Sequence, residues 1–151
     1  MIESLPVEPA TLEDLPAVSV LLQDVELPRD GVEPIIENFL IVRSPVAVAG
    51  PQILIGCIGF ELYGKSALLR SFAVHPDFQK QGLGGRLFLA ALDKARNLQI
   101  KQLYLLTETA EAFFRKRRFV TVDRASVPGD VRDSIEFATL CPTATAMKLQ
   151  L

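Results

Sequence analysis

The stretch Gln79-Lys80-Gln81-Gly82-Leu83-Gly84-Gly85 decides how this chain can fold. It lies between a run typical of a β-strand, Leu68 to Val74, and a run typical of a helix, Leu87 to Arg96. Glycines at such a junction leave backbone N–H groups uncovered, and the helix adds unpartnered first-turn donors and the positive end of its dipole. The junction therefore either binds an anion, usually a phosphate, or is a tight turn that needs glycine for its backbone angles.

The spacing of these glycines excludes two common phosphate-binding loops. A P-loop continues from its last glycine with Lys and then Ser or Thr, whereas Gly85 is followed by Arg86 and Leu87. A dinucleotide-binding fingerprint has Gly-x-Gly-x-x-Gly spacing in the first βαβ unit. Here the spacing is Gly-x-Gly-Gly, and several strand-like runs precede it.

Composition indicates an ordinary globular domain. The 151 residues are 49% hydrophobic and 23% charged, with a net charge of −2, and we expect one domain over residues 1–151. Because the basic residues are scattered except at Arg115 to Arg118, we expect no nucleic-acid partner. The chain has no apolar run of about 20 residues and no signal-peptide pattern, which predicts a cytoplasmic protein without a membrane partner. Two distant cysteines and one histidine indicate reduced thiols and no metal site.

Hydrophobic periodicity predicts an α+β fold with a mixed, mainly antiparallel sheet of about seven strands. The middle strands should be antiparallel neighbours, while a helix from Leu87 to Arg96 should lead to a parallel strand. Gly56 and Gly59 suggest a bulge or the close approach of a ligand. The expected strands are Leu5–Pro9, Phe39–Arg43, Ile53–Leu62, Ala67–Val74, Gln102–Leu106, Phe119–Val122 and Thr145–Leu151. Further helices are expected at Thr11–Gln23, Glu33–Asn38, Glu108–Arg117 and Val131–Leu140, with a possible lid loop at Leu27–Pro34, a largely turn segment at Ser44–Gln52 and a hairpin turn at Tyr63–Ser66.

The run from Leu69 to Gly85 resembles the acetyl-CoA motif of the GNAT N-acyltransferase superfamily. Gln79, Gly82 and Gly84 occupy the fixed positions of that motif, and the expected order of elements matches the family along the whole chain. The resemblance implies the three-layer GNAT fold, with helices on both faces of the sheet. It also implies an acetyl-CoA-dependent N-acetyltransferase, of class EC 2.3.1, with acetyl-CoA as co-substrate and no metal.

Two further stretches narrow the resemblance. Leu103 to Phe119 is similar to the acetyltransferase domains of bacterial N-acetylglutamate synthases. Phe137 to Met147 resembles small acetyltransferases associated with arsenic-resistance operons. Both relatives imply a small amine acceptor that is an amino acid or similar to one. Final strands in this family often pair across a dimer, so a homodimer is one expected assembly.

The resemblance also assigns residues to acetyl-CoA. The backbone of the strand end would hold the pantetheine arm, and one of its N–H groups would polarise the thioester carbonyl. The N–H groups that follow would surround the pyrophosphate, with two side chains at the rim. The strand-end residues are Phe72, Ala73 and Val74, the pyrophosphate residues are Gln81, Gly82, Leu83, Gly84 and Gly85, and the rim residues are Gln79 and Lys80.

This chain departs from the family where many members have a catalytic tyrosine, because Phe114 stands there. The usual glycine before Phe119 is also replaced, by Arg118. No catalytic acid is therefore assigned: Tyr104, Thr107 or a water molecule would donate the proton, or none is needed. Replacement of the tyrosine also leaves open a CoA-binding or sensory module without turnover, and an interaction domain without cofactor is a third alternative.

Several polar residues have two readings each. Ser71 would orient either the amine or its water molecule. Arg70 either binds a substrate carboxylate or faces outwards, and Cys141 either borders the substrate pocket or is an inert buried thiol. Glu61 and Glu108 are candidate bases through water, or solvated acids. His75 is expected to cap the strand, and Phe113 and Phe114 are expected to pack in the core.

Overall fold

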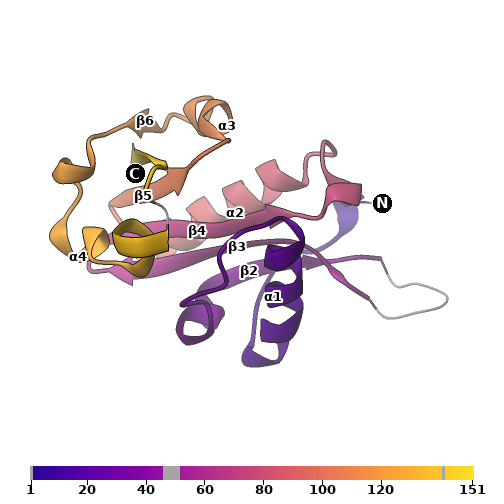
Figure 1. Cartoon of the computed structure of the whole chain (residues 1–151). Coiled ribbons are helices and arrows are strands. Elements are labelled where there is room, and N and C mark those ends of the chain that lie inside the picture. Colours follow the sequence, from indigo (N-terminus) through magenta and orange to yellow (C-terminus); the bar gives the residue numbers. More distant parts are fainter. Residues whose placement is uncertain (1, 46–51, 141) are drawn as a thin grey trace. The chain divides into compact units, whose positions relative to one another are not determined.

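The computed structural model describes residues 2–45, 52–140 and 142–151 (Figure 1). Within them the strands form one seven-stranded sheet in the order β1-β2-β3-β4-β5-β7-β6, which confirms the predicted mixed sheet. The strands are β1 (Glu8–Pro9), β2 (Phe39–Arg43), β3 (Leu54–Tyr63), β4 (Ser66–Val74), β5 (Gln102–Thr107), β6 (Val120–Thr121) and β7 (Thr145–Gln150). The helices are α1 (Leu15–Asp24), α2 (Leu83–Asn97), α3 (Glu111–Arg115) and α4 (Gly129–Arg132), besides 3-10 turns such as Glu33–Asn38 and a π-helical turn, Glu136–Leu140.

The pairing directions follow from the connections. β2 pairs antiparallel with both β1 and β3, and β7 pairs antiparallel with β5 and β6. β3 and β4 are joined by the two-residue turn Gly64–Lys65, with Gly64 at φ +62°, as the predicted hairpin requires. β4 and β5 pair in parallel, as expected for strands joined through α2. Their paired residues run from Ser66 with Gln102 to Leu68 with Tyr104.

Several predicted elements differ from the structure, and the largest differences are in two strands and one helix. The opening strand Leu5–Pro9 is reduced to Glu8–Pro9, since Pro6 and Pro9 have no backbone N–H to donate. The helix Val131–Leu140 is divided into α4 and the π-helical turn, and the strand Phe119–Val122 retains only Val120–Thr121. The turn predicted at Ser44–Gln52 falls largely on residues 46–51, which lie outside the described residues.

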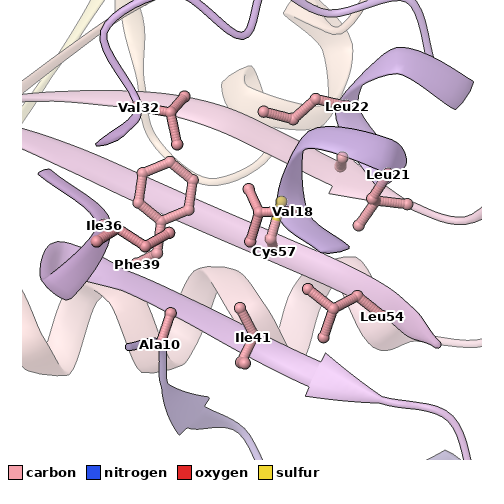
Figure 2. Packing of buried hydrophobic residues seen from close by; sticks show 11 residues of the cluster. Ala10, Val18, Leu21, Leu22, Val32, Ile36, Phe39, Ile41, Leu54 and Cys57 are labelled. Atoms are coloured by element: carbon pink, nitrogen blue, oxygen red, sulfur yellow. The ribbon is translucent and has the colours of Figure 1, made fainter. Parts of the chain in front are cut away.

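The chain divides into two compact units. Unit 1 consists of Met1–Phe60 and Ser71–Lys94, and unit 2 of Glu61–Arg70 and Ala95–Leu151. In unit 1, the buried Cys57 of β3 clusters with Val18 and Leu22 of α1 (Figure 2). The preceding residue, Gly56, faces Leu83 and Leu87 of α2 instead. Because successive strand residues point to opposite faces, α1 and α2 cover opposite faces of the sheet within this unit.

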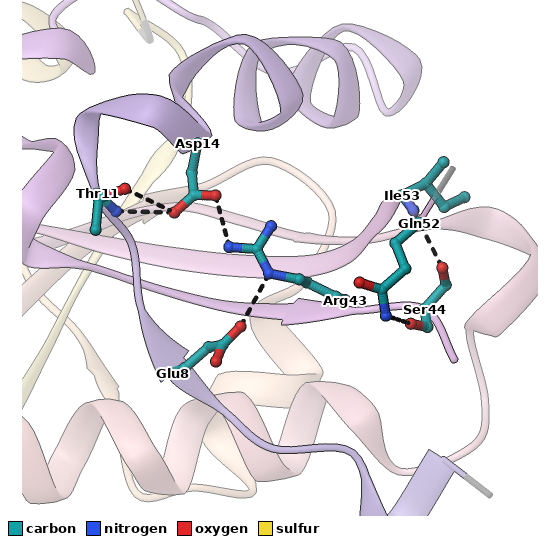
Figure 3. A network of polar contacts seen from close by, with 7 residues as sticks. All are labelled: Glu8, Thr11, Asp14, Arg43, Ser44, Gln52 and Ile53. Atoms are coloured by element: carbon teal, nitrogen blue, oxygen red, sulfur yellow. Dashed lines mark hydrogen bonds and ion pairs between the residues drawn. The ribbon is translucent and has the colours of Figure 1, made fainter. Parts of the chain in front are cut away.

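A polar network fixes the start of the first helical segment in unit 1. The backbone N–H of Thr11 donates to Asp14 Oδ2 at 2.9 Å, as in a capping box (Figure 3). Arg43 of β2 donates to Asp14 Oδ1 at 2.6 Å and to Glu8 Oε1 at 2.9 Å. Burial alone would raise the pKa of Asp14, but the hydrogen bonds from Thr11 and Arg43 outweigh it and lower that pKa.

The core of unit 2 lies over β5 and β7. It joins Leu68 and Tyr104 to Val127, Val131 and Phe137, together with Ala146. This cluster uses the segment after β6, whose short turns bring apolar side chains onto the sheet within the unit.

Candidate functional site

The junction between β4 and α2 is held by local hydrogen bonds within unit 1. The N–H of His75 donates to the carbonyl of Ile55 at 2.8 Å, which ends β4 against β3. The His75 Nδ1 accepts from the N–H of Asp77 at 3.1 Å, so the side chain of His75 caps the 3-10 turn Pro76–Phe78, and not the strand as expected from the sequence. Gln79 Nε2 donates to the carbonyl of Val74 at 2.9 Å and thereby closes the loop onto the strand. These contacts fix the loop before the glycines.

The loop residues Gln79 to Gly82 are exposed. Lys80 at φ +63° and Gly82 at φ +85° both have left-handed backbones, and a Cβ added at Gly82 would meet nothing within 4 Å. The N–H of Arg86 bonds to the carbonyl of Gly82 at 3.2 Å, the first turn of α2. The N–H groups of residues 83–85 precede that bond and so have no partner inside the helix. A 15-residue helix with this open, glycine-bearing start has the geometry of an anion site.

The strand that precedes this loop is distorted at Ser71, which has φ +56° inside β4. A left-handed residue within a strand is the conformation of a bulge, and for a residue other than glycine it costs about 1–3 kcal/mol. Ser71 is buried, and so is Ala73 two residues on. The distortion therefore lies at the start of the predicted pantetheine strand, Phe72 to Val74.

The two strand glycines have packing roles. A Cβ at Gly56 would come within 2.7 Å of Leu87 Cδ1, and one at Gly59 would come within 2.3 Å of the Phe39 ring. The register also shifts between Val42 and Arg43, so the predicted irregularity is present beside Gly56. The close neighbours of both glycines are core side chains, which corrects the idea that a ligand approaches them.

A buried ionic cluster occupies unit 2. The side chain of Arg70 is 0% exposed, with NH1 2.7 Å from Glu61 Oε2 and Nε 3.1 Å from Glu136 Oε2. The hydroxyl of Tyr63 donates to the other oxygen of Glu61. Arg70 thus faces inwards, and the readings of an outward Arg70 and a solvated Glu61 are wrong. The guanidinium can be buried because hydrogen bonds to the carboxylates of Glu61 and Glu136 replace those to water.

The environment of the cluster raises the pKa of Glu136 and that of Tyr63. Burial raises the pKa of Glu136, and the charge of Glu61 raises it further, against the opposing effect of Arg70. Burial and the hydrogen bond to Glu61 together raise the pKa of Tyr63. Two carboxylates around one guanidinium leave a net negative charge, which is why the charge of Glu61 disfavours the charged form of Glu136.

The candidate acids lie in the core of unit 2 rather than at an exposed surface. Tyr104 is 5% exposed and packs in the cluster described above. Thr107 is also buried, and its Oγ1 accepts from the N–H of Ala110 at 2.9 Å, which turns the chain into α3. Phe114 packs edge-on against Phe113 and Phe119, as predicted for core aromatics.

The remaining predicted residues are at the surface or outside the description. Glu108 is exposed and accepts a hydrogen bond from Thr143, so it is the solvated acid of the two readings. In the basic run, Arg115 pairs with Glu111 at 3.1 Å on the exposed face of α3, and Arg117 stacks 3.5 Å above the Phe113 ring. Cys141 lies outside the described residues.

Sequence reasoning missed Glu136, Tyr63 and Cys57. Glu136 carries no local signal, because only the tertiary fold brings it to Arg70. The sequence predicts a turn at Tyr63, although its position two residues after Glu61 places both side chains on one face of β3. Across the parts of the chain that the structure describes, no cluster of metal-ligating side chains occurs, and no helix is long and apolar enough to cross a membrane.

Known proteins give this geometry its context. The model of the acetyltransferase (GNAT) domain matches residues 38–121. The amino-acid acetyltransferase of Mannheimia succiniciproducens is 26% identical over 137 residues, which is 85% of this chain and 30% of that protein. That of Ralstonia nicotianae is 30% identical over 132 residues, 82% of this chain and 28% of the relative. The chain thus spans less than a third of the length of these curated relatives.

Solved structures share the fold. N-acetylglutamate synthase from Neisseria gonorrhoeae, complexed with coenzyme A and L-arginine, superposes with a TM-score of 0.78 at 23% identity, covering 97% of this chain and 33% of that one. Rv2747 from Mycobacterium tuberculosis, in complex with CoA and NLQ, gives a TM-score of 0.76 at 23% identity over 97% of this chain and 99% of that one. The predicted resemblance is confirmed: with more than half of its residues matched by the domain model, the chain belongs to the GNAT acetyltransferase family.

Proposed function

We propose that this protein transfers an acetyl group from acetyl-CoA to the primary amine of a small, amino-acid-like acceptor. The observation that carries the proposal is the open start of α2, where Gly82 leaves space and the first-turn N–H groups have no partner inside the helix. The relatives named amino-acid acetyltransferase support the class of acceptor.

The residues present fit a CoA pyrophosphate. Its negative charge would meet the positive end of the α2 dipole and the backbone donors of residues 81–85. Lys80 adds a cation beside them, and Gln79 holds the loop against Val74. The strand end Phe72, Ala73 and Val74 would pair with the pantetheine arm, and a backbone N–H there would stabilise the negative charge that develops on the thioester oxygen.

The proposed reaction is a direct attack. The neutral amine nitrogen forms a bond to the thioester carbon, the carbon–sulfur bond breaks, and the electron pair leaves with the CoA sulfur. The amine proton passes to water, and the thiolate takes up a proton from solvent or from a nearby hydroxyl. Ser71, Tyr104 and Thr107 remain the proposed hydroxyls, with Ser71 beside the pantetheine strand and the other two buried in unit 2.

Arg70 and Cys141 remain proposed contacts of the acceptor. A carboxylate would bind Arg70 by exchanging with Glu61 or Glu136, because the guanidinium is already paired with both. An acceptor with a carboxylate should therefore be acetylated faster than the matching amine without one.

The test measures acceptor-dependent release of CoA thiol with a panel of amino acids, their phosphinic and arsinic analogues, and matched amines without a carboxylate. CoA should also raise the unfolding free energy by about 2.7 kcal/mol at a hundredfold excess over Kd. Gly84→Val should abolish CoA binding while the chain stays folded, and Leu89→Val, on the exposed side of α2, should leave it unchanged.

The alternative outcomes separate the classes of function. Tight CoA binding without thiol release for any acceptor would indicate the sensory or binding module. An absence of any CoA effect on unfolding, or an unchanged CoA affinity in Gly84→Val, would overturn the assignment of the phosphate site.

A further inference from the structure

Ser71 in β4 is buried and has a left-handed backbone. A residue with φ +56° inside a strand departs from regular strand geometry, so contacts from its surroundings have to hold it there. No glycine is present to relieve the conformation. The surrounding structure of unit 1 must therefore fix it.

The side chain of Cys57, on the neighbouring strand β3, supplies two such contacts. Its Sγ lies 3.2 Å from the carbonyl oxygen of Ser71, to which the thiol donates. A backbone hydrogen bond from Ala73 reaches the same sulfur. One thiol thus bonds to the backbone on both sides of Phe72.

The thiol is suited to this task because it stays neutral and protonated. Cys57 is fully buried, and burial raises the pKa of the thiol to about 12, despite the bond from Ala73 that lowers it. It therefore remains a donor and an acceptor at neutral pH, and it is not a nucleophile. Its other neighbours are apolar, with Val18, Leu22 and Ile41 in the same cluster (Figure 2).

We propose that Cys57 is a positioning residue for acetyl-CoA: its thiol holds the backbone of Ser71 and Ala73, and so sets where the backbone groups of Phe72 to Val74 meet the pantetheine arm and thioester. The proposal rests on the function proposed above. It gives Cys57 a role beyond filling the core, since an apolar residue of equal size would fill the space and leave the two backbone groups without the thiol.

The test compares variants that separate bonding from packing. Cys57→Val keeps an apolar side chain of similar size and removes the thiol. Cys57→Ala also removes the thiol and adds no bulk, so it serves if the valine variant does not fold. Cys57→Ser keeps a hydrogen-bond donor and acceptor at the same position. Val18→Ala is the control, because it removes core volume from the same cluster, on α1, without removing the thiol.

The measurements are Kd for CoA and for adenosine 3′,5′-bisphosphate, and kcat and KM with acetyl-CoA. Cys57→Val and Cys57→Ala should lower kcat/KM by about 10- to 100-fold and weaken CoA binding, since small displacements of positioned groups have effects of that size. Binding of adenosine 3′,5′-bisphosphate should be unchanged, because the phosphate loop is intact. Cys57→Ser should recover most of the loss, and Val18→Ala should keep wild-type constants despite its lower stability.

Two results would overturn the role of Cys57. One is wild-type CoA affinity and kcat/KM in both Cys57→Val and Cys57→Ala. The other is an equal loss in Val18→Ala, which would make the effect one of stability. If the wild-type protein binds CoA but acetylates nothing, the proposed function fails, and CoA affinity alone still decides the role of Cys57.

Discussion

The guanidinium of Arg70 and the carboxylate of Glu136 lie far apart in the sequence and meet inside unit 2, with Nε 3.1 Å from Oε2. Glu61 holds the other side of the guanidinium at 2.7 Å. The pair therefore ties the segment after α4 to the middle of β4. A buried charge of this kind is costly when its partner is lost, more than it is stabilising when present.

Arg70→Ala should lower the free energy of unfolding by about 3–5 kcal/mol, because it leaves two buried carboxylates without their cation. Urea denaturation measures the loss. The matched control is Arg115→Ala, which breaks an exposed pair with Glu111 and should cost at most about 1 kcal/mol. Equal effects of the two substitutions would show that burial does not govern the Arg70 cluster.

Glu136→Gln should change how stability depends on pH. The folded-state pKa of Glu136 lies above its ordinary value of 4.5, so the folded protein binds this proton more tightly than the unfolded chain. The resulting stability is fully present below pH 4.5 and is lost as pH rises through the folded pKa. Relative to Glu136→Gln, the wild-type protein should gain stability as pH falls through that window. A parallel pH profile for both proteins, measured by chemical denaturation, contradicts the assignment.

Arg118→Gly should stabilise the protein by about 1 kcal/mol. Arg118 has φ +73° at the end of α3, and the N–H of Phe119 bonds back to the carbonyl of Phe114 at 3.0 Å. This is the position where a helix end favours glycine, which adopts the left-handed backbone without steric cost. Thermal unfolding measures the gain, and Arg118→Ala is the control, which should give none. A gain in the alanine variant would trace the effect to the lost charge.

Gly59→Ala should strongly destabilise unit 1, by about 1–3 kcal/mol or more, because the new Cβ would lie 2.3 Å from the ring of Phe39. Gly64→Ala tests the opposite case. Gly64 also lies in the β3–β4 hairpin, with φ +62° and open space around it, so only backbone strain of about 1 kcal/mol is expected there. The comparison is made by denaturant unfolding, and an equal loss at both positions would mean that the Phe39 contact relaxes freely.

The glycine-bearing junction between β4 and α2 and the pairing directions of the middle strands were predictable because their signals are local. Glycine spacing between a strand and a helix is read directly from Gln79 to Gly85, and the two-residue turn at Gly64 follows from its hairpin sequence. The Arg70 cluster was not predictable, since the partner Glu136 is brought in by the tertiary fold. The proposed role of Cys57 was not predictable either, because it depends on the left-handed backbone of Ser71, which the sequence around a serine does not indicate.

The two compact units are interleaved along the chain, and this has a consequence for how the protein is made. Unit 1 closes only with residues up to Lys94, after the chain has already passed through Glu61–Arg70 of unit 2. During synthesis, α1 can cover one face of β3 within the first 60 residues, but the other face must wait for α2. Neither unit corresponds to a contiguous fragment, so a nascent chain released early should be a substrate for chaperones and proteases, and not a smaller folded protein.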